Sequence, residues 1–169
     1  MSTESEKLGA IQQVDTNTVS IKIDNEDTLN SLQVNQLILI RSTNTGEHIV
    51  AIINKIIRSS HELDAEDGSL QIENLIKAHL VGTWHDKIGL SENIFKRSLK
   101  VVPSIGADSF LLSGEQLNTF MSSISHEGEK GLEIGTYTIQ KEVIAHLDGN
   151  KFFQRHAVIV GGTGSGKSW

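Results

Sequence analysis

Residues 155–169 read RHAVIVGGTGSGKSW and contain a phosphate-binding pattern. Gly161, four further residues and then Gly166, Lys167 and Ser168 satisfy G-x-x-x-x-G-K-[ST], the P-loop of proteins that bind nucleoside triphosphates. Glycines permit positive φ angles and close approach of the backbone, so successive N–H groups can surround phosphate oxygens. The pattern predicts a cofactor-binding loop made of Gly161, Gly162, Thr163, Gly164, Ser165, Gly166, Lys167 and Ser168.

Two side chains of this loop carry specific chemistry. Lys167 is the expected catalytic residue, because its ammonium would neutralise charge on the β- and γ-phosphates of ATP. Ser168 is the expected metal ligand, because its hydroxyl would help to hold Mg²⁺ beside those phosphates. ATP and Mg²⁺ are therefore the predicted cofactors.

The residues that precede the loop supply the strand that a P-loop requires. Residues 157–160 are a short β-branched run with apolar side chains on both faces, as in a buried strand of a parallel sheet. A P-loop also needs a helix whose N-terminus faces the phosphates, and the sequence stops at Trp169, before that helix. We therefore expect the front part of a longer ATPase, inactive by itself.

Composition is that of a globular protein. Of the 169 residues, 37% are hydrophobic, and no apolar run approaches the roughly 20 residues needed to cross a bilayer. The first residues lack the basic start and apolar core of a signal peptide, which favours a cytoplasmic location without membrane contact. The formal net charge of -6 argues against a DNA-binding surface, because phosphate neutralisation needs clustered Lys and Arg. Any DNA contact is expected outside this segment.

The first half of the chain predicts a small closed β-barrel. Short runs rich in β-branched residues alternate with polar turns, and a long helix is absent from the pattern. The expected strands include residues 19–23, 37–40 and 49–57, and the turns lie at 25–27 and 43–47. The segment 71–80 fits a helix or a strand, and a strand is favoured because the barrel needs one more. The acidic stretch 60–68 is interpreted as a hairpin loop, since its spacing does not match a calcium-binding loop.

A change of pattern after Trp84 marks the predicted domain boundary. Pro103 predicts an extended crossing or a turn, because proline fixes φ and removes a backbone donor. Ser113 followed by Gln116 forms a capping box and predicts a helix with Leu117, Phe120, Met121 and Ile124 on one face. Residues 132–147 return to strand-like alternation. The expected domains are a barrel over 1–100, for assembly or partner docking, and a junction with the truncated start of a P-loop ATPase domain over 101–169.

The C-terminal third resembles the HerA family, hexameric ATPases of the HerA/FtsK group that act as DNA translocases. The residues that carry this resemblance are 132–135, 143–148 and 152–168, in which an Arg-His pair, an apolar strand and TGSGKS follow one another. Residues 103–108 also look like the family's junction. The resemblance implies a mainly β N-terminal small barrel of the HerA and ATP-synthase type, followed by the incomplete start of a RecA-like α/β P-loop ATPase domain.

The same resemblance implies partners and a function. A homo-hexamer would bind nucleotide between subunits and pass double-stranded DNA through its central channel. The barrels would dock a partner nuclease or an antiviral-defence effector, such as a sirtuin-like NAD-consuming protein. The implied function is that of the N-terminal part of an ATP-driven DNA translocase or helicase-like ATPase.

Two alternatives stay open at the level of the sequence. One is an oligomerisation and docking module without ATPase activity in this form, because an acidic barrel surface suits protein better than DNA. The other is a rotary-ATPase-like or terminase-like P-loop motor, although rotary subunits generally have Thr at the position of Ser168.

Overall fold

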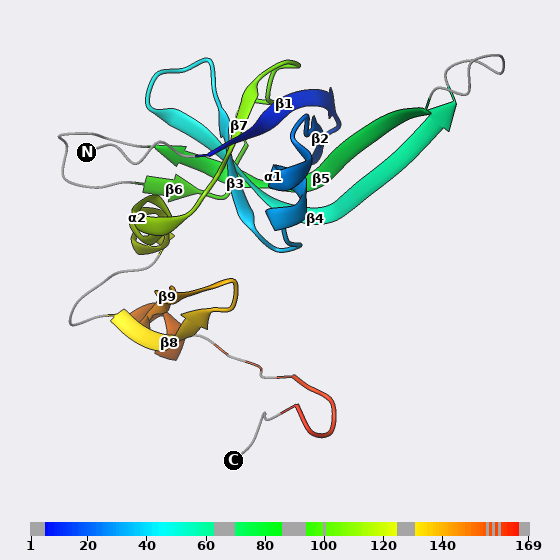
Figure 1. Ribbon diagram of the computed structural model, residues 1–169. Coiled ribbons are helices and arrows are strands. Elements are labelled where there is room, and N and C mark those ends of the chain that lie inside the picture. The colour runs from blue at the N-terminus through cyan, green and yellow to red at the C-terminus, as the bar shows by residue number, and fades with distance from the viewer. Residues whose placement is uncertain are drawn as a thin grey trace.

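The computed structural model describes residues 6–62, 70–85, 94–99, 101–124, 131–154, 156, 158 and 160–165. Its strands are β1 (Lys7–Val14), β2 (Thr18–Lys22), β3 (Leu37–Arg41), β4 (Glu47–Glu62), β5 (Leu70–His85), β6 (Ile94–Lys96), β7 (Asp108–Leu111), β8 (Gly131–Tyr137) and β9 (Gln140–Asp148). Its helices are α1 (Glu26–Ser31), α2 (Gly114–Ile124) and α3 (Gly149–Phe153). They form a barrel and a separate two-stranded hairpin (Figure 1).

Within the described residues, six strands close into an antiparallel barrel in the order β2-β1-β7-β3-β4-β5. The barrel closes because β2 pairs with β5 as well as with β1, placing Ile21 opposite Ile76. The short strand β6 extends the sheet at the other end of β5, beyond the part that pairs with β2. The mainly β fold class is thereby confirmed, and so is the strand over 71–80, which lies in β5.

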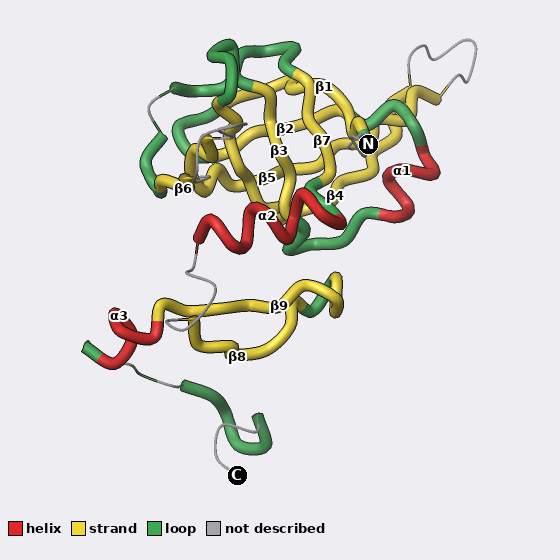
Figure 2. The backbone as a smooth tube through the Cα atoms, turned by 90° about the vertical axis from the view of Figure 1, so that its left-hand side faces the viewer, coloured by secondary structure: helices red, strands yellow, loops and turns green. Residues whose placement is uncertain are grey.

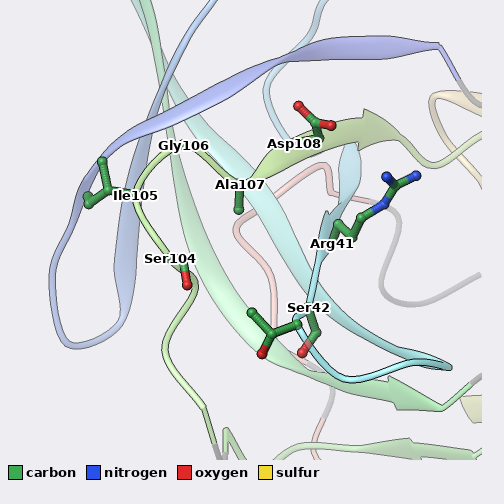
Figure 3. A pocket seen from close by; sticks show the side chains of 8 residues that line it. Arg41, Ser42, Ser104, Ile105, Gly106, Ala107 and Asp108 are labelled. Carbon is green, nitrogen blue, oxygen red and sulfur yellow. The ribbon is translucent and has the colours of Figure 1, made fainter.

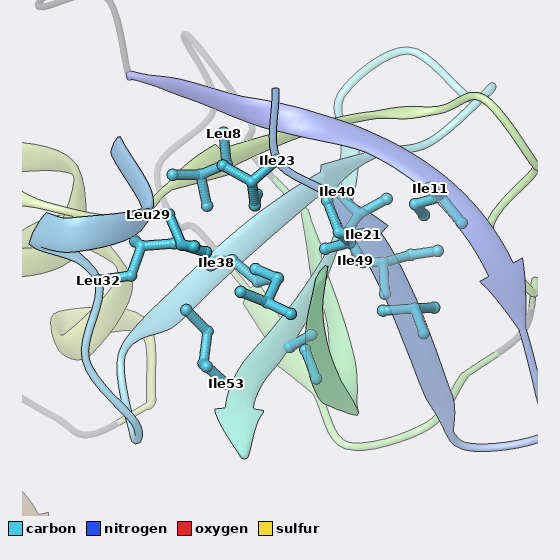
Figure 4. Packing of buried hydrophobic residues seen from close by; sticks show 14 residues of the cluster. Leu8, Ile11, Ile21, Ile23, Leu29, Leu32, Ile38, Ile40, Ile49 and Ile53 are labelled. Carbon is cyan, nitrogen blue, oxygen red and sulfur yellow. The ribbon is translucent and has the colours of Figure 1, made fainter. Parts of the chain in front are cut away.

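Aliphatic side chains fill the barrel interior (Figure 4). Because successive side chains of a strand point to opposite faces, β-branched residues at alternate positions can all face inward. Ile21, Ile38 and Ile76 have no exposed surface at all. The barrel core consists of Leu8, Ile11, Val19, Ile21, Ile23, Leu29, Leu32, Ile38, Ile40, Ile49, Ala51, Ile53, Ile76 and Ala78.

Helix α1 replaces the turn that the sequence predicted at 25–27. The Asn25 side chain caps this helix, accepting hydrogen bonds from the backbone N–H groups of Asp27 at 2.8 Å and Thr28 at 3.4 Å. Asn and Asp are favoured in turns and at helix N-caps for the same reason, so the residues alone do not distinguish the two. Leu29 and Leu32 then pack into the barrel core, which stabilises the helical alternative.

Strand β7 belongs to the barrel sheet. It follows residue 100, at which the barrel was expected to end from the sequence. It lies between β1 and β3 and joins them into one sheet. Ser109 is fully buried, and its hydroxyl donates a hydrogen bond to the carbonyl of Gly9 at 2.9 Å. Pro103 lies in the irregular segment before β7, as predicted. The barrel sheet therefore includes residues up to Leu111.

Helix α2 covers the outer surface of the barrel and builds a second core. The predicted helix is confirmed: Leu117 and Phe120 are buried, whereas Ile124 is 47% exposed. Phe120 meets Trp84 of β5 edge-on, with ring centroids 5.8 Å apart, and meets Phe95 of β6 in the same way at 5.2 Å. This outer core consists of Leu39, Val50, Trp84, Leu112, Leu117, Phe120 and Val143.

The β8–β9 hairpin packs against this outer core (Figure 2). Val143 of β9 is buried in it, and the Gln140 side-chain oxygen accepts a hydrogen bond from the backbone N–H of Gly114 at 3.2 Å. The Tyr137 hydroxyl donates to the carbonyl of Asn35, in the turn before β3. Burial raises the pKa of the Tyr137 phenol above its usual value. The hairpin thus contacts the outer core, the start of α2 and the turn before β3.

Truncation of the barrel core should destabilise the chain. We expect Ile21→Ala to lower the free energy of unfolding by about 2–5 kcal/mol, since it removes buried methyl groups and leaves a cavity. Urea denaturation measures this change. The matched control is Val102→Ala, at a side chain 53% exposed, which should change stability by less than about 0.5 kcal/mol. Equal losses in the two variants would contradict the closed core.

Removal of the Tyr137 hydroxyl should loosen the hairpin and alter its pH dependence. Because the folded pKa is raised, the stabilisation is complete below about pH 10, the ordinary tyrosine pKa, and is lost as pH rises through the folded value. Tyr137→Phe should remove this alkaline loss and cost about 0.5–1.5 kcal/mol at neutral pH. Unfolding measured from pH 7 to 11 tests both, and an identical alkaline profile in the variant would show that Tyr137 is not responsible.

Candidate nucleotide-binding site

The structure describes part of the predicted phosphate-binding loop. Gly161, Gly162, Thr163, Gly164 and Ser165 are all exposed. Gly166, Lys167 and Ser168 lie outside the described residues. The assignment of Lys167 to phosphate and of Ser168 to Mg²⁺ therefore stays a prediction.

The described part of the loop forms a tight turn. The N–H of Ser165 donates to the carbonyl of Gly162 at 3.2 Å, and Gly164 has a φ of 82°. A positive φ at the third residue of a four-residue turn is the feature that glycine provides without steric cost. A Cβ atom added at Gly162 or Gly164 would meet nothing within 4 Å, so this side of the loop is open.

The residue types of this turn are those expected of a phosphate-binding loop. Consecutive residues without large side chains present their backbone N–H groups at the surface, where an anion can approach. The positive φ of Gly164 is a conformation that anion-binding backbone turns use, and the N–H of Ser165 is bonded to the carbonyl of Gly162 within the turn. Such a loop can hold phosphate oxygens of a nucleotide, while the charge for the β- and γ-phosphates would come from Lys167.

The strand predicted over 157–160 is not present at the residues that the structure describes there. Val158 and Val160 are in irregular backbone and are 82% and 85% exposed. A strand needs a neighbour to bond its N–H and C=O groups. Among the described strands, β8 and β9 pair only with each other, and none pairs with this segment. The expectation of a buried strand is thus wrong for Val158 and Val160.

A short helix that the sequence analysis missed connects the hairpin to the loop. Helix α3 begins after Asp148, whose carboxylate accepts a hydrogen bond from the backbone N–H of Lys151 at 3.1 Å. The Lys151 ammonium also lies 3.1 Å from that carboxylate. The signal was available in the Asp-Gly-Asn-Lys sequence, because Asp is a favoured N-cap residue.

The described part of the chain has neither a metal-binding cluster nor a membrane-spanning helix. No three His, Asp or Glu side chains there gather closely enough to hold a metal ion. None of the helices described is long and apolar enough to cross a membrane.

Comparison with known proteins identifies the segment that contains this loop. A search of curated proteins finds no match to the chain. Residues 132–169 match the family model described as "Helicase HerA, central domain". The match begins in β8, runs through β9 and α3, and includes the whole P-loop pattern. Residues 132–169 are therefore similar to the central domain of the HerA-type ATPases.

Proposed function

We propose that this chain is the N-terminal barrel and the opening of the motor domain of an ATP-driven, HerA-type DNA translocase. One observation carries the proposal: the P-loop pattern lies inside the residues that match the HerA central domain. A P-loop pattern alone fits many kinds of ATP-driven motor. A family match without the loop would not indicate that the chain binds ATP. Together they favour an ATPase of the HerA/FtsK type over a rotary or terminase-like motor.

The residues of the loop have distinct proposed roles in hydrolysis. The backbone N–H groups from Gly161 to Gly166 surround the phosphates, Lys167 neutralises their charge, and Ser168 helps to hold Mg²⁺. ATP with Mg²⁺ supplies the phosphoanhydride bond whose hydrolysis drives movement. Catalysis of phosphoryl transfer consists mainly of positioning and charge stabilisation, so these residues act by binding and orienting.

The barrel has a separate role in this proposal. The matched HerA segment begins in the hairpin, which is attached to the barrel by Val143, Gln140 and Tyr137. The barrel can therefore set the position of the loop relative to neighbouring subunits. We place the end of the barrel after β7, the junction at α2, and the start of the motor domain at β8.

The proposed partners follow from the family and from the charge of the chain. A homo-hexamer would bind nucleotide between subunits and pass double-stranded DNA through its channel, with DNA contacts outside this segment. The net charge of -6 favours a protein partner for the barrel, such as a nuclease or an antiviral-defence effector.

Substitution of the P-loop lysine tests the motor assignment. In the complete protein, Lys167→Ala should lower ATP turnover at least about 100-fold, because the charge that stabilises the transferring phosphoryl group is lost. The thermal unfolding of the barrel should be unchanged. Lys151→Ala is the matched control, since this lysine is exposed in α3 and pairs only at the surface. ATP turnover that persists in Lys167→Ala would contradict the assignment of this loop to ATP hydrolysis.

A second candidate is an oligomerisation and docking module without ATPase activity in this form. It is favoured by one observation: among the described residues, neither hydrophobic core includes a residue of the loop. The same measurement separates the two functions. A complete wild-type protein that hydrolyses ATP no faster than Lys167→Ala, yet assembles, would support the docking module.

A further inference from the structure

Three polar side chains lie in one row across the outer surface of the barrel. They come from neighbouring strands, because β5 pairs with β2 on one side and with β4 on the other. Ser20 of β2 is opposite Lys77 of β5, and Lys77 is opposite Lys55 of β4. The next pair along β4 and β5, Ile56 and Ile76, contacts the barrel core, so this row points away from the core. We name Ser20, Lys77 and Lys55 the lysine row.

Two positive charges face each other in the lysine row. Lys55 and Lys77 are both exposed, and side chains directly opposite in an antiparallel pair have Cβ atoms about 4.5–5.5 Å apart. Neither ammonium forms an ion pair with a carboxylate of the described residues. Like charges in this arrangement destabilise a sheet. An anion bound between the two ammonium groups would offset their repulsion, because it attracts both.

A buried hydroxyl lies beside the two lysines. Ser20 is only 8% exposed, and its side chain makes no hydrogen bond to another residue that the structure describes. The hydroxyl still reaches the surface, since the described side-chain polar atom that is both fully enclosed and without a partner is Nε1 of Trp84. A serine hydroxyl can donate one hydrogen bond. Ser20 therefore adds a neutral donor next to the Lys77 ammonium.

Neighbouring charges on this face of the barrel already have partners. Lys22 follows Ser20 on β2, and its ammonium lies 3.7 Å from the Asp24 carboxylate. Glu73 precedes Lys77 on the same face of β5, and its carboxylate accepts a hydrogen bond from the Gln12 side-chain amide at 3.5 Å. The unbalanced positive charge of this face therefore lies in the lysine row.

The surface pocket beside the turn between β3 and β4 differs from the lysine row (Figure 3). It has a volume of about 400 Å³, and both Arg41 and Asp108 line it. The Lys7 ammonium lies 2.8 Å from the Asp108 carboxylate, and this hydrogen bond holds the pKa of Asp108 below its usual value. Cζ of Arg41 lies 5.3 Å from the centroid of the Phe110 ring. The pocket thus holds a carboxylate near its cation, whereas the lysine row does not.

We propose that the lysine row binds the phosphate group of a small phosphate monoester. Lys55 and Lys77 donate charge-assisted hydrogen bonds to its oxygens, and the Ser20 hydroxyl donates a further one. A monoester carries a charge of about −1.5 to −2 at pH 7, which matches two ammonium groups. A nucleic-acid strand is a weaker candidate, because the net charge of -6 repels such a polyanion. The site uses no P-loop residue, so it is independent of ATP hydrolysis.

An NMR titration tests the site directly. The parent protein carries Lys167→Ala, which removes the charge of the P-loop. Methyl phosphate should shift the amide signals of Ser20, Lys55 and Lys77 in this parent. Adding Lys77→Ala should weaken binding at least about tenfold, because a hydrogen bond to a charged group is lost. Lys141→Ala, at an exposed lysine of β9, is the control and should leave the affinity unchanged. Absence of shifts at the lysine row would overturn the proposal.

Two further ligands distinguish the monoester from a nucleic-acid backbone. Dimethyl phosphate, a diester with a single charge, should bind at least about tenfold more weakly than methyl phosphate, because one charge-assisted hydrogen bond is lost. A short single-stranded DNA should bind no more tightly than dimethyl phosphate. All titrations are made at one ionic strength, because salt screens such interactions. Equal binding of dimethyl phosphate, or tighter binding of DNA, would contradict the assignment to a monoester.

Thermal unfolding provides a second test, which uses the repulsion between the lysines. Lys55→Glu places a carboxylate opposite Lys77, so it should raise the unfolding temperature in buffer without phosphate. Methyl phosphate should raise the unfolding temperature of the parent protein but not that of this variant, because ligand binding stabilises only a protein with an intact site. Lys141→Glu is the control and should keep the full response to methyl phosphate. The same response in Lys55→Glu would show that the ligand binds elsewhere.

Discussion

The pairing of β2 with β5 is the interaction on which the rest of the structure depends. The strand order without this pairing is an open sheet, and β2 at its edge would offer unpaired N–H and C=O groups to other chains. With the pairing, the edge disappears and the apolar face of each barrel strand is enclosed. The pairing with β2 also holds β5 in place. Because β5 pairs with β4 and β6 and carries Trp84, it sets the positions of all three.

Trp84 connects the closed barrel to everything that follows it in the chain. It lies on the outer surface of β5, where Phe120 of α2 packs against its ring. Val143 extends this outer core into the hairpin, at the beginning of the HerA segment. Because protein interiors are close-packed, a shift of the barrel wall is transmitted to the hairpin through these contacts. The barrel and the segment that matches the HerA central domain therefore share one packed interface.

The sequence predicted those parts of the fold whose signal is local. Alternating β-branched residues indicated the barrel, and the capping box indicated α2, because both patterns follow from the geometry of a single element. It missed β7, since Asp108–Leu111 are four residues after an irregular stretch and pair only with strands distant in the sequence. It was wrong about Val158 and Val160, because a strand depends on neighbours that a motif does not supply. The P-loop was recognisable because its pattern is a contiguous run of residues.

The register of the long hairpin has a consequence for how such chains diverge. Beyond the pairing of Lys22 with Leu75, the hairpin of β4 and β5 no longer takes part in closure, so its length is free to change while the barrel stays intact. An insertion of two residues in each strand preserves the inward and outward alternation, but an insertion of one reverses every side chain beyond it. Related chains can therefore differ in the length of this hairpin in steps of two residues.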